Sequence, residues 1–406
     1  MKPSLFFLPL SLVLLSITFV VSVAEEKQAN SLNQLVNREV TRYAEGGEFV
    51  GAVTLVARDG KIQDLQAHGV RNLKTSEPVT TDSIFKIHSF TKAITCTAAL
   101  MLYEQGEFQF DDPVSKWLPE FGTLTVEKEG GGEPVKAEEE MLVKHLFTHT
   151  SGLSYKHAGL FSDASSLADV VTALATKPLS FEPGTSWEYG MSIDVLGRLV
   201  EIWSEQDFAA FLDKEILEPL QMVDTAFYVP QEKEGRRVTI YTSGKDKPTE
   251  FSAAPENSKV PRAVPAFCMP GGGLYSTATD YFKFLRMIQN GGEWDGKRYL
   301  KPGTRDLMVT NQVPESIGWI RFGKQIRDGF GYGYGFNTVV KKSEWDPAAK
   351  VDEAGWGGKA SCHYWFEPEA GTIVITLEQI IPYRQSLEKV LKGPVYRALG
   401  DSVSAK

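Results

Sequence analysis

The feature that most restricts the fold of this chain is the order of its patterns: extended segments stand at both ends and helical segments between them. Asp59-Gly60 separates two extended runs within residues 50–70, which is a strong signal for a β-hairpin. Extended patterns return in the last part of the chain. The predicted strands there occupy residues 332–342, 361–368 and 371–380, the last two joined by a turn at 369–371, and a closing helix occupies 383–399.

Apolar side chains with helical spacing dominate the middle of the chain. Predicted helices occupy residues 89–105, 138–153, 165–176, 192–204 and 206–217, and one more follows a Gly-rich stretch within 266–292. We therefore predict an α+β fold: an antiparallel sheet flanked by helices is built from both chain ends, and a mainly helical domain is inserted. The α/β part is expected at about 30–111 and 266–400 and the helical part at about 112–265.

The first 24 residues have the pattern of a secretory signal peptide. Lys2 precedes a long apolar run, and Ser22 and Ala24 fit the −3 and −1 positions of a signal-peptidase site. An uncleaved membrane anchor is the competing interpretation, because the run approaches membrane-spanning length. No second long apolar run follows. We expect residues 25–406 to be secreted or periplasmic, with no membrane contact after cleavage.

Charge and composition argue against several classes of partner. The formal net charge is −9 and no Lys/Arg-rich run is present, so a nucleic-acid partner is not expected. The cysteines are Cys96, Cys268 and Cys362, an odd count in apolar surroundings that favours buried thiols. His145 and His149 have the spacing of a metal pair, but the glutamate of the His-Glu-x-x-His zinc motif is absent. We expect no cofactor.

A serine stands three positions before a lysine at the start of the predicted helix 89–105. Ser89 and Lys92 would share one helix face, where lysine could accept the serine proton if burial or a nearby cation lowered its pKa. The alternative is an N-terminal capping serine followed by a surface lysine. The same spacing recurs at residues 386–389, where nothing catalytic is near in sequence.

Two further stretches can complete a catalytic site. Tyr189 follows a Pro-Gly loop and precedes a helix, and a tyrosine hydroxyl near a lysine cation can shuttle protons. Gly357 and Gly358 begin a predicted strand, where backbone N–H groups can approach an oxyanion. Each has an ordinary alternative, a tyrosine packed at a helix start and a tight turn at a strand start. A Gly-x-Ser-x-Gly elbow of the α/β-hydrolase type is absent.

Together these stretches resemble a known pattern. Ser-x-x-Lys at a helix start, a mid-chain tyrosine and a late Gly-rich strand characterise the serine β-lactamase and penicillin-binding-protein superfamily. Within it the chain looks most like the class C β-lactamase-related esterases, the family VIII carboxylesterases. The segments that carry the resemblance are residues 145–153, 191–201, 271–300 and 355–358, and it extends over about residues 30–398.

The resemblance implies a β-lactamase/transpeptidase-like fold and a role for each residue of the site. Ser89 would be the acylated nucleophile, Lys92 its base partner, and Tyr189 would help to deprotonate Ser89 and later activate water. The backbone N–H groups of Ser89 and Lys359 would form the oxyanion hole. Trp356-Gly357-Gly358 stands where β-lactamases carry Lys-Thr-Gly.

Two departures from the family pattern bear on the substrate. Met191 stands where many relatives have an asparagine that binds the substrate amide, and Trp356 replaces a lysine that binds the β-lactam carboxylate. Both changes favour neutral esters. We therefore expect an exported serine hydrolase that cleaves small carboxylic esters through an acyl-enzyme. The alternatives are a β-lactamase or D-amino-acid peptidase acting on a small amide, and an acyltransferase with an acceptor other than water. The sequence does not predict the oligomeric state.

Overall fold

The computed structural model describes residues 31–244, 250–369 and 371–400. The predicted signal peptide and the centre of the predicted turn at 369–371 lie outside these residues, so both stay predictions. Within the described residues, no helix is long and apolar enough to cross a membrane. Export of the chain likewise stays a prediction.

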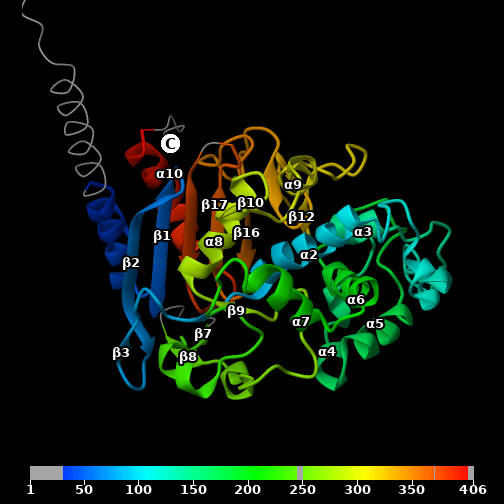
Figure 1. The fold of residues 1–406 in the computed structure, drawn as a ribbon, viewed down its shortest axis with the longest axis horizontal. Helices are drawn as coiled ribbons and strands as arrows, with labels where there is room; N and C mark the ends of the chain where they lie inside the picture. Colours follow the sequence, from blue (N-terminus) through cyan, green and yellow to red (C-terminus); the bar gives the residue numbers. More distant parts are fainter. Residues whose placement is uncertain (1–30, 245–249, 370, 401–406) are drawn as a thin grey trace, which may run out of the picture.

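An eight-stranded antiparallel sheet, visible in Figure 1, joins the two ends of the chain. Strand β1 of the N-terminal hairpin lies between β2 and β18, and Leu55 of β1 is opposite Ile375 of β18. The predicted antiparallel sheet built from both chain ends is therefore confirmed. In spatial order the strands are β14 (Phe330–Tyr332), β15 (Asn337–Val339), β16 (Ala354–Gly358), β17 (Cys362–Phe366), β18 (Ile373–Leu377), β1 (Gly51–Arg58), β2 (Lys61–Asn72) and β3 (Glu77–Pro78).

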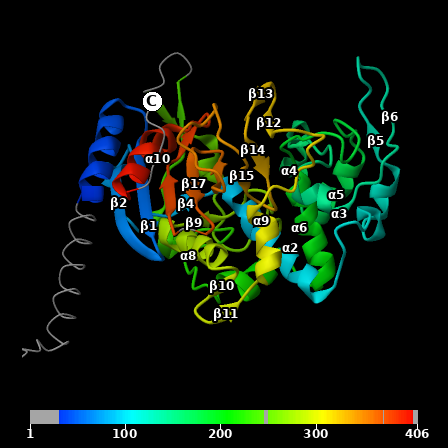
Figure 2. The ribbon, with the colours of Figure 1, turned by 90° about the horizontal axis from the view of Figure 1, so that it is seen from above.

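Helices cover both faces of this sheet because the side chains of its central strands alternate between two apolar cores. On β1, Val53 and Leu55 join the larger core, which also holds α2 (Thr91–Gln105) and α8 (Ala278–Gln289). Ala52 and Val56 point to the smaller core, which contains α10 (Ser386–Ala398) and the helical residues 31–45. Figure 2 shows α10 and residues 31–45 together at one side of the sheet.

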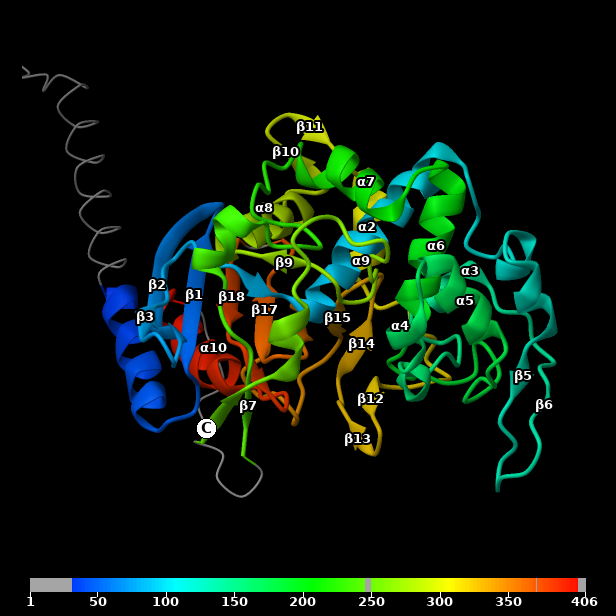
Figure 3. The same ribbon diagram turned by 90° about the horizontal axis from the view of Figure 1, so that it is seen from below.

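The chain between α2 and α8 forms most of the remaining helices, which gather away from the sheet in Figure 3. It also contains short strands, and β7 pairs in parallel with β19 near the C-terminal end of the chain. The predicted domain boundaries stay a prediction. The elements are β5 (Thr125–Val126), β6 (Val135–Lys136), α3 (Val143–Phe147), α4 (Leu160–Asp163), α5 (Leu167–Ala175), α6 (Ser192–Ser204), α7 (Phe208–Leu212), β7 (Tyr241–Ser243) and β8 (Phe251–Ala253), with β19 at Ile380–Ile381.

Local predictions succeeded where capping and periodicity agree. The hairpin turn at Asp59-Gly60 is present, with positive φ at both residues, and α6 has the predicted bounds. The helix predicted at 138–153 is wrong in extent, because α3 is a short helix followed by a turn. The strand predicted at 332–342 is also wrong: a corner at residues 333–336 separates β14 from β15. The smaller remaining elements are β4 (Phe85–Lys86), β9 (Tyr275–Ser276), β10 (Glu293–Trp294), β11 (Lys297–Arg298), α9 (Pro302–Val309), β12 (Arg321–Phe322) and β13 (Gln325–Ile326).

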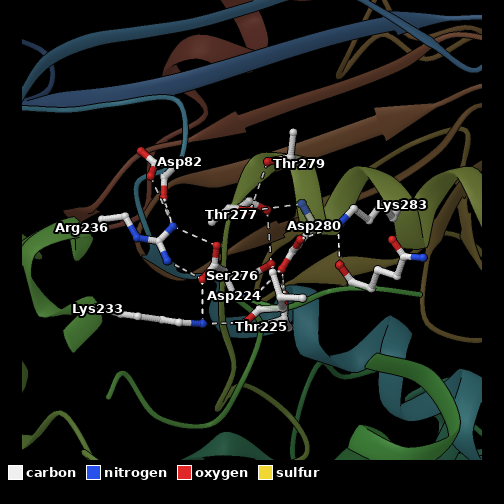
Figure 4. A network of polar contacts seen from close by, with 12 residues as sticks. Asp82, Asp224, Thr225, Lys233, Arg236, Ser276, Thr277, Thr279, Asp280 and Lys283 are labelled. Carbon is white, nitrogen blue, oxygen red and sulfur yellow. Dashed lines mark hydrogen bonds and ion pairs between the residues drawn. The ribbon is translucent and has the colours of Figure 1, made fainter. Parts of the chain in front are cut away.

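A polar network fixes the strand that leads to α8. Figure 4 shows Asp280, in the first turn of α8, accepting hydrogen bonds from the backbone N–H of Asp224 (2.7 Å) and the hydroxyl of Thr225 (3.2 Å). Arg236 in turn pairs with the Asp224 carboxylate. Just before α8, β9 pairs with β4, the strand that precedes Ser89. The network thus joins residues 224–225 to the first turn of α8.

Candidate active site

Ser89 lies in a single 3-10 turn, His88–Phe90, between β4 and α2. His88 has φ +46°, a conformation that costs energy for a residue with a side chain, and the Thr91 hydroxyl holds its carbonyl at 2.7 Å. The neighbours of Ser89 on both sides are buried, while Ser89 itself is half-buried. At the start of α2 no side chain acts as a cap, so the capping-serine interpretation of Ser89 is wrong.

Lys92 is completely buried in the first turn of α2. Its ammonium group donates to Ser89 Oγ at 3.3 Å, to the Tyr155 hydroxyl at 2.9 Å and to the Gly271 carbonyl at 2.5 Å. Three acceptors use all three donors of an ammonium group. The predicted proximity of Ser89 and Lys92 is therefore present, and the surface-lysine interpretation is wrong.

The charge state of Lys92 differs from the one that a lysine base requires. Burial lowers the pKa of Lys92, but attraction to Tyr155, Tyr189 and the Asp194 carboxylate outweighs it and holds the pKa above its usual value. The resting lysine is therefore an ammonium ion. Lys92 and a neighbouring tyrosine must therefore lose one proton between them before the pair can act as a base.

Tyr155 is the tyrosine that bonds to Lys92, and the sequence analysis missed it. It begins a 3-10 turn, Tyr155–His157, after α3. Burial raises the pKa of its hydroxyl, although the Lys92 cation acts in the opposite direction. Nothing local distinguishes it among the 14 tyrosines of the chain. Its importance comes only from the packing that brings residue 155 to residue 92.

Tyr189 also reaches Lys92, but with a different part of its side chain. The Lys92 nitrogen lies 4.7 Å from the centre of the Tyr189 ring, a cation–π arrangement. The Tyr189 hydroxyl accepts a hydrogen bond from the indole Nε1–H of Trp356 at 3.2 Å. The three stretches singled out in the sequence, around residues 89–92, 189 and 355–359, are thus neighbours in space.

Aromatic rings pack around Trp356 beside Tyr189. The Trp356 ring lies 5.1 Å from the ring of Tyr189, 5.0 Å from Tyr332 and 6.0 Å from Phe322, measured between centroids. Phe322 belongs to the β12–β13 hairpin and also lies 5.7 Å from Tyr189. The sequence analysis did not find Phe322, because a two-residue strand carries almost no periodicity. We call Tyr189, Phe322, Tyr332 and Trp356 the aromatic wall.

The glycines after Trp356 bring the C-terminal end of β16 close to the turn that carries Ser89. A Cβ added to Gly358 would lie 2.7 Å from the Ile87 carbonyl oxygen, so only glycine permits this approach. The next residue, Lys359, has a mostly exposed side chain that pairs with Glu256 at 3.6 Å. Within the described chain, the first hydrogen bonds of the 3-10 turn come from the N–H groups of Phe90 and Thr91, which leaves that of Ser89 available.

The match to a family model decides the family. The model, described as Beta-lactamase, matches residues 36–380. The chain belongs to this family. The expected resemblance and fold are thereby confirmed, and the chain is a serine hydrolase of the β-lactamase fold, a class that includes esterases and acyltransferases.

Named relatives support the esterase branch of the family. Esterase EstB of Burkholderia gladioli is 31% identical over 393 residues, covering 88% of this chain and 91% of that protein. Lovastatin esterase of Penicillium rubens is 28% identical, covering 86% and 95%. The solved structure of EstCE1, described as a hydrolase with promiscuous acyltransferase activity, has a TM-score of 0.74 at 22% identity and covers 93% of this chain and 100% of its own.

Proposed function

We propose that this chain is a carboxylesterase that forms an acyl-enzyme on Ser89. The observation that carries the proposal is the buried contact of Lys92 with both Ser89 Oγ and the Tyr155 hydroxyl. A serine hydroxyl is a weak nucleophile until a base takes its proton, and a lysine–phenol pair that has lost one proton is such a base. EstB and lovastatin esterase are named for the same class of reaction.

The proposed reaction has two balanced halves. In acylation, Ser89 passes its proton to the deprotonated Lys92–tyrosine pair while Oγ bonds to the ester carbonyl carbon. The C–O bond to the alcohol then breaks, and the leaving alkoxide takes up that proton. In deacylation, water gives a proton to the same pair and its oxygen attacks the acyl carbon. Ser89 Oγ leaves and recovers the proton.

We further propose that Tyr155 and Tyr189 both belong to the proton-transfer machinery, each through its own contact with Lys92. Tyr155 bonds directly to the lysine that contacts Ser89. Tyr189 stands between Lys92 and Trp356, beside the aromatic wall. The backbone N–H groups of Ser89 and Lys359 are proposed to bind the oxyanion, an arrangement that the close approach of Gly358 to Ile87 supports.

The aromatic wall favours esters with an apolar, uncharged acyl or alcohol group. The Trp356 indole is neutral and therefore offers no cation to a substrate carboxylate. It is also almost completely buried, and its N–H is already bonded to Tyr189. Flat apolar rings recognise alkyl and aryl groups well. We therefore expect β-lactams and D-amino-acid peptides to be turned over slowly. Acyl transfer to an alcohol is the second candidate, favoured by the promiscuous acyltransferase activity described for EstCE1.

A labelling experiment combined with a substrate panel tests the proposal. A fluorophosphonate should modify the protein at Ser89, as located by peptide mapping. Short p-nitrophenyl esters should be hydrolysed and a chromogenic cephalosporin should be turned over slowly or not at all. Modification at another residue, or efficient cephalosporin cleavage without ester cleavage, would overturn the proposal. Adding a primary alcohol separates the second candidate, because acyl transfer yields the new ester in place of the acid.

Export is proposed from the pattern of the first 24 residues. The test is expression of the full chain in its own cells, followed by N-terminal sequencing of the enzyme. A mature chain that begins at Glu25 supports cleavage, and one that retains Lys2 contradicts it.

A further inference from the structure

A buried carboxylate that the reaction described above does not use lies beside the active-site lysine. Asp194 is the third residue of α6 and has no exposed surface. Its Oδ1 accepts the backbone N–H of Gly271 at 2.9 Å. Among the described residues, its Oδ2 has no hydrogen-bond partner. A buried carboxylate with one free oxygen requires a compensating positive charge nearby.

Gly271 connects this carboxylate to Lys92. The residue donates its N–H to Asp194 on one side and accepts from the Lys92 ammonium on the other. The adjacent Pro270 carbonyl accepts from the hydroxyl of Thr95 at 2.8 Å, which fixes the segment against α2. A Cβ on Gly271 would lie 2.7 Å from Asp194 Oδ2, so glycine allows the carboxylate to come this close.

The groups around Lys92 leave Asp194 as its one anionic neighbour within the described residues. Burial, with the cations of Lys86, Lys359 and Lys92, lowers the pKa of His88, and burial with the Lys92 cation lowers that of His149. Both histidines are therefore neutral. Burial raises the pKa of Asp194 to about 6, against the opposing effects of Lys92 and the Gly271 N–H, so the carboxyl is ionised at pH 7 and above. The titratable groups that face the pair are His88 on the 3-10 turn, Cys96 on α2, His149 and Tyr155 after α3, and Tyr189 before α6.

We propose that Asp194 is a positioning residue for proton transfer: its carboxylate is the counter-charge that keeps Lys92 an ammonium, and through Gly271 it holds that ammonium toward Ser89. This inference rests on the proposed function, because it concerns the same lysine. Asp194 has no contact with Ser89 and takes no proton from it. Its effect is to set the pH at which the Lys92–tyrosine pair loses the proton that makes it a base.

The sign of the pH effect follows from this arrangement. The acylating form has one proton fewer than the resting form, so the rate of acylation should rise with pH. A negative charge beside Lys92 delays this loss to higher pH. Replacing Asp194 by asparagine keeps an acceptor for the Gly271 N–H but removes the charge. The ascending limb of the pH–rate profile should then move to lower pH.

The experiment compares Asp194→Asn with Asp280→Asn. Asp280 is a matched control, because it is also a buried aspartate at the third position of a helix, but it belongs to the network of Figure 4. For Asp194→Asn we expect the limb of kcat/KM for a p-nitrophenyl ester to shift down by about one pH unit or more. We also expect kcat at its plateau to fall about 10- to 100-fold, with KM changed less than about twofold. Asp280→Asn should reduce thermal stability and leave the pH profile in place.

The experiments distinguish a failure of the role proposed for Asp194 from a failure of the proposed esterase function. If fluorophosphonate labels Ser89 of the unaltered enzyme but Asp194→Asn keeps its pH profile, the role of Asp194 is wrong while the esterase proposal stands. If the label is elsewhere, the esterase proposal itself fails.

If Asp194→Asn does not fold, a measurement on the unaltered enzyme still tests the inference. The ¹⁵N signal of Lys92 Nζ, identified by its change on phosphonylation of Ser89, should show an inflection at the Asp194 pKa of about 6. A signal that stays constant through this pH range would overturn the inference.

Discussion

The sequence contains three Ser-x-x-Lys segments, at residues 83–86, 89–92 and 386–389. The last two both stand at a helix start, and only the first of these two builds a site. Residues 89–92 precede and begin α2, and residues 386–389 begin α10. Lys92 is fully buried and donates to three acceptors, whereas Lys389 is exposed. Equal spacing therefore gives two lysines with different surroundings. The spacing places a lysine near a serine, and the rest of the fold decides what that lysine contacts.

The difference comes from contacts that are distant in sequence. Tyr155 and Gly271, two of the three acceptors for Lys92, lie 63 and 179 residues away from it. The backbone before the serine also differs, because Ser89 follows His88 in a strained conformation within its own 3-10 turn. A helix start alone supplies neither feature. Convergence of several segments on one buried ammonium, rather than the four-residue pattern, is what makes residues 89–92 a candidate site.

Replacing the nucleophile should have the largest effect. Ser89→Ala removes the only oxygen that the proposed mechanism acylates, so ester hydrolysis should fall by about 10⁴-fold or more. The substitution removes one hydrogen bond from a half-buried position, so the fold should persist. The measurements are steady-state kinetics with a p-nitrophenyl ester and a thermal melt. A variant that keeps more than a tenth of the activity would show that Ser89 is not the nucleophile.

The sequence predicted the sheet and the proximity of Ser89 to Lys92 because both depend on short-range patterns. Alternating apolar residues and the Asp59-Gly60 turn define the first hairpin, and i, i+3 spacing brings Lys92 to Ser89. The sequence could not predict Tyr155 or Phe322. Each lies in a turn or a very short strand, and its place is set by long-range packing.

The charge of Lys92 was also beyond local prediction. A buried lysine alone would have a lowered pKa, and the sequence interpretation relied on that effect. The pKa is raised because Tyr155, Tyr189 and Asp194 come from three other segments. Met191, the residue noted as a departure, is buried in the larger core at the start of α6. Asp194 lies three positions after Met191 on α6, but nothing in the sequence connects it to Lys92.

An effect of intermediate size is expected at the two tyrosines beside Lys92, contacts that Lys389 of the α10 segment does not have in the described structure. If direct bonding to the lysine is what matters, Tyr155→Phe should reduce kcat by about 10²- to 10³-fold, within the range expected for loss of a general acid–base group. Tyr189→Phe keeps the ring over Lys92 and loses only the hydroxyl that accepts from Trp356. If Tyr189 instead carries the main transfer, as the family resemblance implies, the larger loss will belong to Tyr189→Phe.

Rapid-quench measurement of the acyl-enzyme separates the two tyrosines by step. Loss of the acylation burst in one variant and accumulation of acyl-enzyme in the other would assign acylation to the first tyrosine and deacylation to the second. Equal small losses in both variants, less than about threefold, would remove tyrosine from the proposed machinery altogether and leave Lys92 as the one proton acceptor.

The smallest effect is expected at the Ser-x-x-Lys segment of α10, residues 386–389. Ser386→Ala and Lys389→Ala each remove one member of this segment. Lys389 is exposed and has no described contact with Ser89, Lys92 or the aromatic wall. Alanine is at least as good a helix former as either residue, and an exposed lysine contributes little to stability. Both variants should keep kcat/KM within about twofold and stability within about 0.5 kcal/mol, a range typical of surface substitutions. A large loss of activity in Lys389→Ala would mean that a Ser-x-x-Lys pair can act from an exposed position. In that case the burial of Lys92 and its three acceptors would not explain why residues 89–92 form the site.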